Sequence, residues 1–462
     1  MKITFKRTNF GAACLAAFLC MVIQLLILAM RDGGELHLES MFFFVNYLEE
    51  RSFAQLIFDP FRNDWGSYQA RELSYFFDFL DAHFVAFLLK KQIVWFHSIC
   101  SLLLCGVMVF IQHYYTRKFF PRIPGMTVTL ISVFFVLTAA VTGLGYFRCA
   151  KYLTATGLWG ALFAGYACCR YGSVRSKAAL VFSLLLMTLS DRQGFFFTAA
   201  LGGSVGLLWF LNAKYRSRTV MERTRFVTLA ALGAVIFGIL NNLYMTPAIV
   251  QHLNGYEVDF GYQRDWEPSF SALKSGFFFL TGNIGNWFSN YTGSICIAGV
   301  TGSLLIAGLG VLLYLRFRKG EMSFFYLAPL WVCALGAMFV CAFTMVARHA
   351  LIMLPDVVYG TYAINFLVIT LFLLTLTAAG GRGKFRTVLP VLLAVGIVLR
   401  VGGEAVGNSF MPEQVSFSGI NSRQHVLKEA LRDTSYDENR HCMPLRMELF
   451  LKFYREHVLT KE

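Results

Sequence analysis

Apolar runs of about twenty residues recur along almost the whole chain and limit its fold more than any other feature. A helix of roughly 20 residues is long enough to cross the hydrocarbon core of a bilayer. The chain is 56% hydrophobic and 15% charged, whereas a soluble domain carries about 25% charged residues. The sequence therefore predicts an all-α, polytopic membrane protein. It excludes a cytosolic enzyme, a secreted disulfide scaffold and a disordered or fibrous chain.

The runs predict about eleven transmembrane helices, which would place the two chain ends on opposite sides of the membrane. We expect residues 1–406 to form a multi-span membrane domain and 407–462 a small soluble tail. The first run is too long for the apolar part of a signal peptide, so we expect an uncleaved anchor. The spans are expected near 11–30, 92–112, 125–147, 152–171, 178–190, 194–211, 226–246, 292–315, 323–345, 360–379 and 387–406.

Basic residues gather in the short segments on one side of these spans. Six such segments hold 20 of the 41 Lys and Arg residues, against two acids, Glu222 and Glu321. Because basic loops stay in the cytoplasm, we expect a cell (inner) membrane protein with a cytoplasmic N-terminus. The net charge of +14 then indicates membrane lipids as partners, and no nucleic acid. The bases are Lys2, Lys6, Arg7, Arg117, Lys118, Arg122, Arg170, Arg175, Lys177, Lys214, Arg216, Arg218, Arg223, Arg225, Arg316, Arg318, Lys319, Arg382, Lys384 and Arg386.

The first predicted outer loop, 31–83, is rich in acids and has a helical pattern. Its apolar positions 73, 76, 77, 80 and 84 follow the period of an amphipathic helix. We expect that helix to lie on the membrane with its apolar side down and its polar side, including Asp78 and Asp81, solvated. The stretch MFFFVNYLEERSFAQLIF is a second candidate helix, and DPFRNDWGSYQ reads as a turn. A further outer loop is expected at 247–290.

Candidate catalytic acids lie in the same loop. Asp32 and Glu35 directly follow the first span in RDGGELHLE, although a solvated helix end would explain them equally well. Glu72 adjoins Arg71 at the head of the predicted amphipathic helix.

Several basic residues lie at the predicted outer ends of other spans, where a cluster of cations would suit a phosphate. Asp191 sits among them, in LSDRQGFF. The alternatives are that Asp191 pairs with its neighbours, that Arg348 extends to the membrane surface, and that His349 is structural. The basic residues at these outer span ends are Arg148, Lys151, Arg192, Arg348 and His349.

The eleven cysteines mostly lie within predicted spans, where cysteine behaves as a small apolar residue. No CxxC or Cys/His spacing typical of a metal site occurs. The spacing therefore predicts neither a zinc site nor a disulfide framework.

The layout of the chain resembles the GT-C superfamily of integral-membrane glycosyltransferases. The shared features are a basic inner N-terminus, one span, a long acidic outer loop, many further spans and an outer tail. The resemblance implies a sugar donor linked to polyprenyl phosphate and an acceptor that is a glycan, lipid or protein. It also implies a base among Asp32, Glu35 and Glu72, with a phosphate held by Arg71, Arg148, Lys151, Arg192, Arg348 and His349. Whether a divalent cation takes part is left open.

Two other classes of membrane protein fit the same pattern. An O-antigen or polysaccharide polymerase or ligase has a similar number of spans but more naturally carries its main outer loop late in the chain. A transporter or flippase of lipid-linked sugars would show internal repeats and broken polar helices. A purely structural or assembly protein also remains open.

Overall fold

The computed structural model describes twelve stretches of the chain, and they contain helices but no β-strand. The predicted all-α class is therefore confirmed for these residues. They are 2–30, 46–48, 51–60, 70–91, 98–140, 149–211, 218–257, 300–304, 307–308, 311, 357–380 and 385–405.

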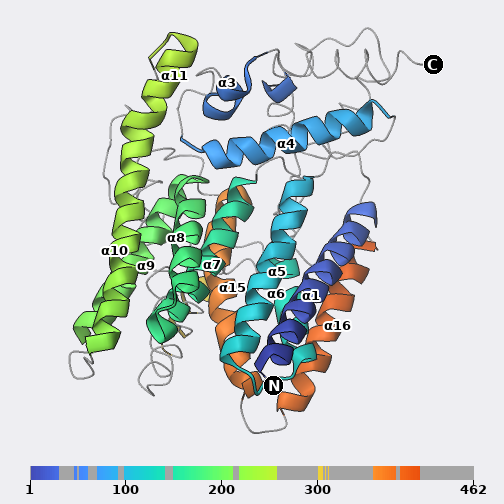
Figure 1. Ribbon diagram of the computed structural model, residues 1–462. Helices are drawn as coiled ribbons and strands as arrows, with labels where there is room; N and C mark the ends of the chain where they lie inside the picture. The colour runs from blue at the N-terminus through green and yellow to red at the C-terminus, as the bar shows by residue number, and fades with distance from the viewer. Residues whose placement is uncertain are drawn as a thin grey trace.

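Most of the described helices stand side by side in one bundle, and a few lie at one of its ends (Figure 1). The upright helices are α1 (Lys2–Met30), α5 (Ile99–Phe119), α6 (Gly125–Ala140), α7 (Ala150–Tyr171), α8 (Val174–Thr188), α9 (Arg192–Leu211), α10 (Arg218–Leu240), α15 (Val357–Gly380) and α16 (Phe385–Ala405). At one end lie α3 (Phe53–Phe58), α4 (Glu72–Leu89) and α11 (Thr246–Asn254), and the π-helix η3 (Asn241–Met245) joins α10 to α11.

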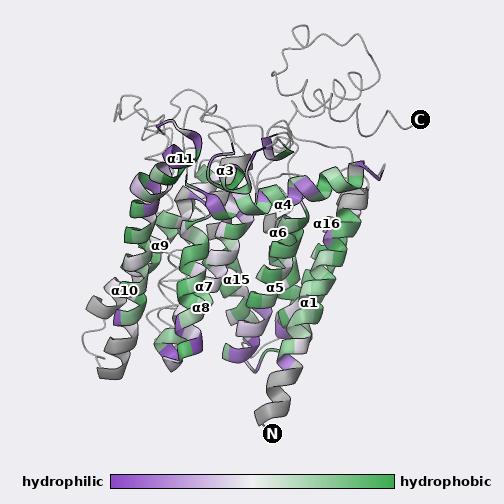
Figure 2. Cartoon of the chain, turned by 45° about the horizontal axis from the view of Figure 1, so that its top comes forward, coloured by the Kyte–Doolittle hydropathy of each residue, from purple (hydrophilic) through white to green (hydrophobic). Residues whose placement is uncertain are grey.

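Three helical stretches in the described residues are long and apolar enough to cross a membrane: Asn9–Ile27, Ile99–Phe119 and Thr224–Asn254. Three shorter apolar helices accompany them, at Gly125–Leu137, Leu371–Gly380 and Arg386–Leu399. Apolar residues dominate the middle of the upright helices, and polar residues gather toward their ends (Figure 2). A membrane protein is thus supported, while the number of about eleven spans stays a prediction.

The structure corrects the edges of some expected spans. α8 and α9 are separate helices on either side of Asp191, as expected. The second span begins at Ile99 rather than near residue 92, because the Ser98 side chain caps α5. The span expected to end at residue 246 continues as helix to Asn254, so the outer loop expected from 247 begins as a helix. The span 323–345 and the tail 407–462 lie outside the described residues, as does most of 292–315.

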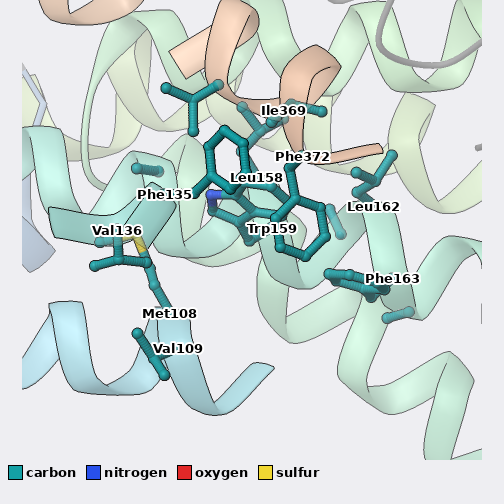
Figure 3. Close-up of a cluster of buried hydrophobic side chains, with 14 of the residues drawn as sticks. Met108, Val109, Phe135, Val136, Leu158, Trp159, Leu162, Phe163, Ile369 and Phe372 are labelled. Atoms are coloured by element: carbon teal, nitrogen blue, oxygen red, sulfur yellow. The ribbon is translucent and has the colours of Figure 1, made fainter. Parts of the chain in front are cut away.

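The centre of the bundle is an apolar core that joins four helices. The ring of Trp159 on α7 meets Phe372 of α15 edge to face, with centroids 4.9 Å apart. Phe372 also meets Phe135 of α6 at 5.7 Å, and Phe163 stacks on Tyr115 of α5 at 5.5 Å. Figure 3 shows Trp159, Phe135 and Phe372 converging in this core. Such aromatic pairs add about 0.5–1.5 kcal/mol each beyond burial of their area.

α7 and α8 pack closely because α7 carries glycines on the side that faces α8. A Cβ atom added at Gly157 would lie 2.9 Å from the Ser183 carbonyl oxygen, and one at Gly160 would overlap the Ser183 side chain. Small residues let apolar helices approach closely in a membrane.

α4 lies across the ends of α5 and α7 rather than parallel to them (Figure 1). The helix predicted from the apolar period is confirmed, but the expected solvation of its polar side is wrong. Asp78 and Asp81 are each 1% exposed, while Leu80 and Phe84 on the apolar side are 41% and 38% exposed. The polar side faces the bundle because its carboxylates bind the N-terminal ends of the upright helices.

Candidate functional site

Two carboxylates fix α4 on the bundle. Asp78 accepts a hydrogen bond from the Cys149 backbone N–H, 2.9 Å away, directly before α7 begins. Asp81 accepts one from the Cys100 N–H, also at 2.9 Å, in the first turn of α5, and another from the Ser98 hydroxyl. The first N–H groups of a helix lack partners within the helix and carry partial positive charge, so a carboxylate satisfies both needs. Asp78 and Asp81 therefore hold α4 in place.

The first residues of α4 are positioned by a different group of charges. Asp191, 2% exposed, lies between α8 and α9 and accepts two cations. Arg71 Nη2 is 3.3 Å from Asp191 Oδ1, and Lys151 Nζ at the start of α7 is 3.7 Å from Oδ2. These three residues, which we call the Asp191 cluster, carry a net charge of +1. Pairing with cations offsets the cost of burying the Asp191 carboxylate.

Glu72, the first residue of α4, binds the other side of the bundle. Its carboxylate accepts hydrogen bonds from the Asn241 side-chain amide, 3.2 Å from both oxygens, and from the Thr246 hydroxyl. The Asn242 side chain accepts a further hydrogen bond from the Ala70 N–H at 3.2 Å. The start of α4 is thus tied to the junction of α10 and α11.

That junction is a π-helix because a proline follows it. Pro247 has no N–H to donate, and its ring would collide with the carbonyl four residues earlier in a regular α-helix. The chain instead widens over Asn241–Met245, and the Thr246 N–H bonds to the Asn241 carbonyl five residues back. This wide turn places the Asn241 and Thr246 side chains together, with Thr246 Oγ1 3.2 Å from Asn241 Oδ1. Single π-turns of this kind are frequent at functional sites.

The surroundings of Glu72 favour a proton-accepting role. Burial raises the pKa of the Glu72 carboxyl, while the hydrogen bonds from Thr246 and Asn241 oppose that rise by stabilising the charged form. A carboxyl with a raised pKa is a stronger base once it is ionised. Glu72 therefore combines fixed orientation with increased basicity.

A small outer layer lies above these residues. The Gln55 side chain on α3 donates to the Leu253 carbonyl at 3.2 Å and to the Asn254 side chain at 3.0 Å. The Asn254 amide in turn donates to Asp59 at 3.3 Å. α3 thus corresponds to the end of the second helix expected in the first loop, and it is fastened to α11 on the same side as α4.

The structure brings part of the predicted site together. Arg71 and Lys151 meet at Asp191, and Glu72 directly follows Arg71 in sequence. Asp191 does pair, with Arg71 and Lys151 of two other elements. Arg192 begins α9, and its side chain lies outside the described part of the chain. Asp32, Glu35, Arg148, Arg348 and His349 also lie outside it.

Two residues of the site escaped sequence analysis. Asn241 and Thr246 lie within the apolar run 226–246, which was read as a plain span. The signal that marks them is an Asn-Asn pair followed closely by Thr-Pro near the end of the run, since amides are costly in a membrane unless they have partners.

The arrangement can bind an anion and accept a proton at one end of a group of apolar helices. Arg71 and Lys151 supply the positive charge, and Glu72 is the acceptor. No protein-family model and no curated protein matches this sequence.

Proposed function

We propose that this chain is a membrane glycosyltransferase that moves a sugar from a polyprenyl-phosphate donor to an acceptor glycan, lipid or protein. The observation that carries the proposal is that the half-buried Glu72 carboxylate directly follows Arg71, a member of the Asp191 cluster, at the end of the bundle. Burial raises the pKa of this carboxyl, and the residue before it, Arg71, belongs to a cluster with a surplus positive charge.

The chemistry requires both halves of this site. The acceptor hydroxyl attacks C1 of the sugar while Glu72 takes its proton, and the bond between C1 and the phosphate oxygen breaks. The leaving phosphate gains negative charge, which Arg71 and Lys151 stabilise in a partly dehydrated setting. Arg148, Arg192, Arg348 and His349 are further phosphate ligands proposed from the sequence, and Asp32 and Glu35 are the alternative bases.

The base is tested by changing acids to amides. Membranes containing the wild-type chain or the variants Glu72→Gln, Asp32→Asn and Glu35→Gln are given a panel of radiolabelled polyprenyl-phosphate sugars, and label in the acceptor fraction is measured. We expect Glu72→Gln to lower transfer by about 10²–10⁴-fold, the usual contribution of a general base. The matched control is Glu257→Gln, an exposed acid beyond α11, which should transfer at the wild-type rate.

Each other outcome has a definite meaning. Loss of transfer in Asp32→Asn or Glu35→Gln, with Glu72→Gln unaffected, moves the base to the residues directly after the first span. Wild-type rates in all three variants contradict the assignment of a catalytic acid. Consumption of a diphosphate-linked oligosaccharide by the wild-type chain would favour a polymerase or ligase, and movement of lipid across the bilayer without transfer would favour a flippase.

The phosphate half is tested by binding. Polyprenyl phosphate is titrated against the purified chain in nanodiscs, with Lys151→Gln compared to Lys90→Gln. Lys151 belongs to the Asp191 cluster, whereas Lys90 is an exposed residue at the other end of α4. We expect at least a tenfold weaker affinity for Lys151→Gln alone. Equal affinities would remove the Asp191 cluster from the phosphate site.

A further inference from the structure

Two buried cysteines and an aspartate from three different helices meet where α4 crosses the ends of α5 and α7. We propose that Asp81, Cys100 and Cys149 form a zinc site. One potential ligand atom from each of the three residues lies within 4.8 Å of the others. Asp81 is 1% exposed, Cys100 8% and Cys149 0%. A zinc ion there would have one ligand each from α4, α5 and the start of α7.

The distances suit tetrahedral zinc. Zinc binds cysteine sulfur at about 2.3 Å and carboxylate oxygen at about 2.0–2.2 Å, so a sulfur and an oxygen ligand lie about 3.5 Å apart. Cys149 Sγ is 3.3 Å from Asp81 Oδ2. The Ser98 hydroxyl, 3.5 Å from Cys149 Sγ and hydrogen-bonded to Asp81, offers an oxygen as the fourth ligand. The Cys149 sulfur and the Asp81 oxygen therefore already lie at about the separation of two zinc ligands.

The helix ends balance the charge of the site. Two thiolates and a carboxylate carry −3, so a zinc ion leaves −1. Cys100 lies in the first turn of α5, and Cys149 directly precedes α7. Each helix N-terminus acts as roughly half a positive charge. A zinc complex at this place is thus close to neutral.

The ligand set indicates zinc rather than another metal. Thiolates are soft ligands that select zinc or copper(I), and they disfavour magnesium and calcium. The carboxylate favours zinc over copper(I). Full burial is typical of a structural ion with no open position. The ion would fasten α4 to the bundle and so position Arg71 and Glu72, independently of whether the chain transfers sugars.

Sequence spacing predicted no zinc site because the ligands are far apart in the chain. Cys100 lies 19 residues after Asp81, and Cys149 lies 68 residues after Asp81. Zinc motifs are recognised when pairs of ligands lie a few residues apart. Here the crossing of α4 over two helix ends gathers the ligands instead.

The test is the metal content of the full chain. The protein is purified under reducing conditions, incubated with zinc chloride and passed through a desalting column, and zinc is measured by mass spectrometry. We expect one zinc ion per chain in the wild type and loss of zinc in Cys100→Ser and Cys149→Ser. Cys105→Ser and Cys168→Ser are matched controls, since each is a buried cysteine on the same helix as one ligand. Both controls should keep one zinc ion.

X-ray absorption at the zinc edge decides the case even if the serine variants fail to fold. We expect two sulfur neighbours at about 2.3 Å in the wild type. A wild-type chain without zinc, or zinc without sulfur neighbours, overturns the proposal. Zinc retained in both serine variants overturns the proposal as well. So does a disulfide between Cys100 and Cys149, detected by mass spectrometry in the chain purified without reductant, if that disulfide persists when zinc is supplied.

Discussion

At the scale of single residues, the hydrogen bond from Thr246 to Glu72 sets the behaviour of the proposed base. Thr246→Val keeps the size of the side chain and removes the hydroxyl that stabilises the ionised carboxylate. The pKa of Glu72 should therefore rise further, and the lower limb of the pH–rate profile for sugar transfer should move up by about one pH unit, since a hydrogen bond to a charged group contributes about 1.5–3 kcal/mol. The measurement is the rate of transfer between pH 4 and 9.

The matched variant is Thr228→Val, because the Thr228 hydroxyl donates a hydrogen bond to the Thr224 carbonyl within α10, away from Glu72. Its profile should equal that of the wild type. A profile unchanged in Thr246→Val would mean that another group governs the rate. The raised pKa of Glu72 also affects stability. The folded chain holds this proton more tightly than the unfolded chain, so the free energy of unfolding should fall as pH rises through the range in which Glu72 ionises.

The residues of the site differ in how far the sequence predicted them. Lys151 was singled out because a charge at the end of an apolar run is costly unless it is paired or functional. Arg71 and Glu72 were singled out because they lie at the head of the predicted amphipathic helix. The partnership of Asp191 with Arg71 was not predicted, because they lie 120 positions apart. The burial of Asp78 and Asp81 was missed because an amphipathic pattern shows two sides of a helix and not which side meets the bundle.

At the scale of elements, the contact between α7 and α8 depends on glycine. Gly157→Leu adds a side chain where even a Cβ atom would lie 2.9 Å from the Ser183 carbonyl oxygen. We expect it to destabilise the protein by about 1–3 kcal/mol or more, as overpacking usually does. Gly233→Leu is the control, since Gly233 is exposed on α10 with no atom within 4 Å of its added Cβ. Thermal unfolding in detergent should show a lower Tm for Gly157→Leu only; equal values would show that the two helices can separate without cost.

The ends of the helices were harder to predict than their existence. Hydropathy marks where a chain is apolar, while the start of α5 is set by the Ser98 cap. Likewise, the apolar run predicted a span that ends at residue 246, but the π-turn at Asn241–Met245 accommodates Pro247 and lets the helix continue to Asn254. Local backbone chemistry of this kind has no signature in hydropathy.

At the scale of the whole molecule, the described connections from α5 to α6 and from α7 to α8 lie at the end of the bundle opposite α4 (Figure 1). The connection from α5 to α6 contains Arg122, whose carbonyl accepts a hydrogen bond of 3.1 Å from the Arg386 side chain at the start of α16. Two basic segments far apart in the sequence thus lie side by side, as the positive-inside rule requires of loops on one face.

Reporter fusions test the orientation that we predict from the bias of basic residues toward one side of the membrane. Alkaline phosphatase fused at Lys214 should be inactive, and the same enzyme fused at the C-terminus should be active, because an odd number of spans places the two points on opposite sides. Activity at both points, or at neither, would rule out the odd number and with it the predicted outer position of the tail.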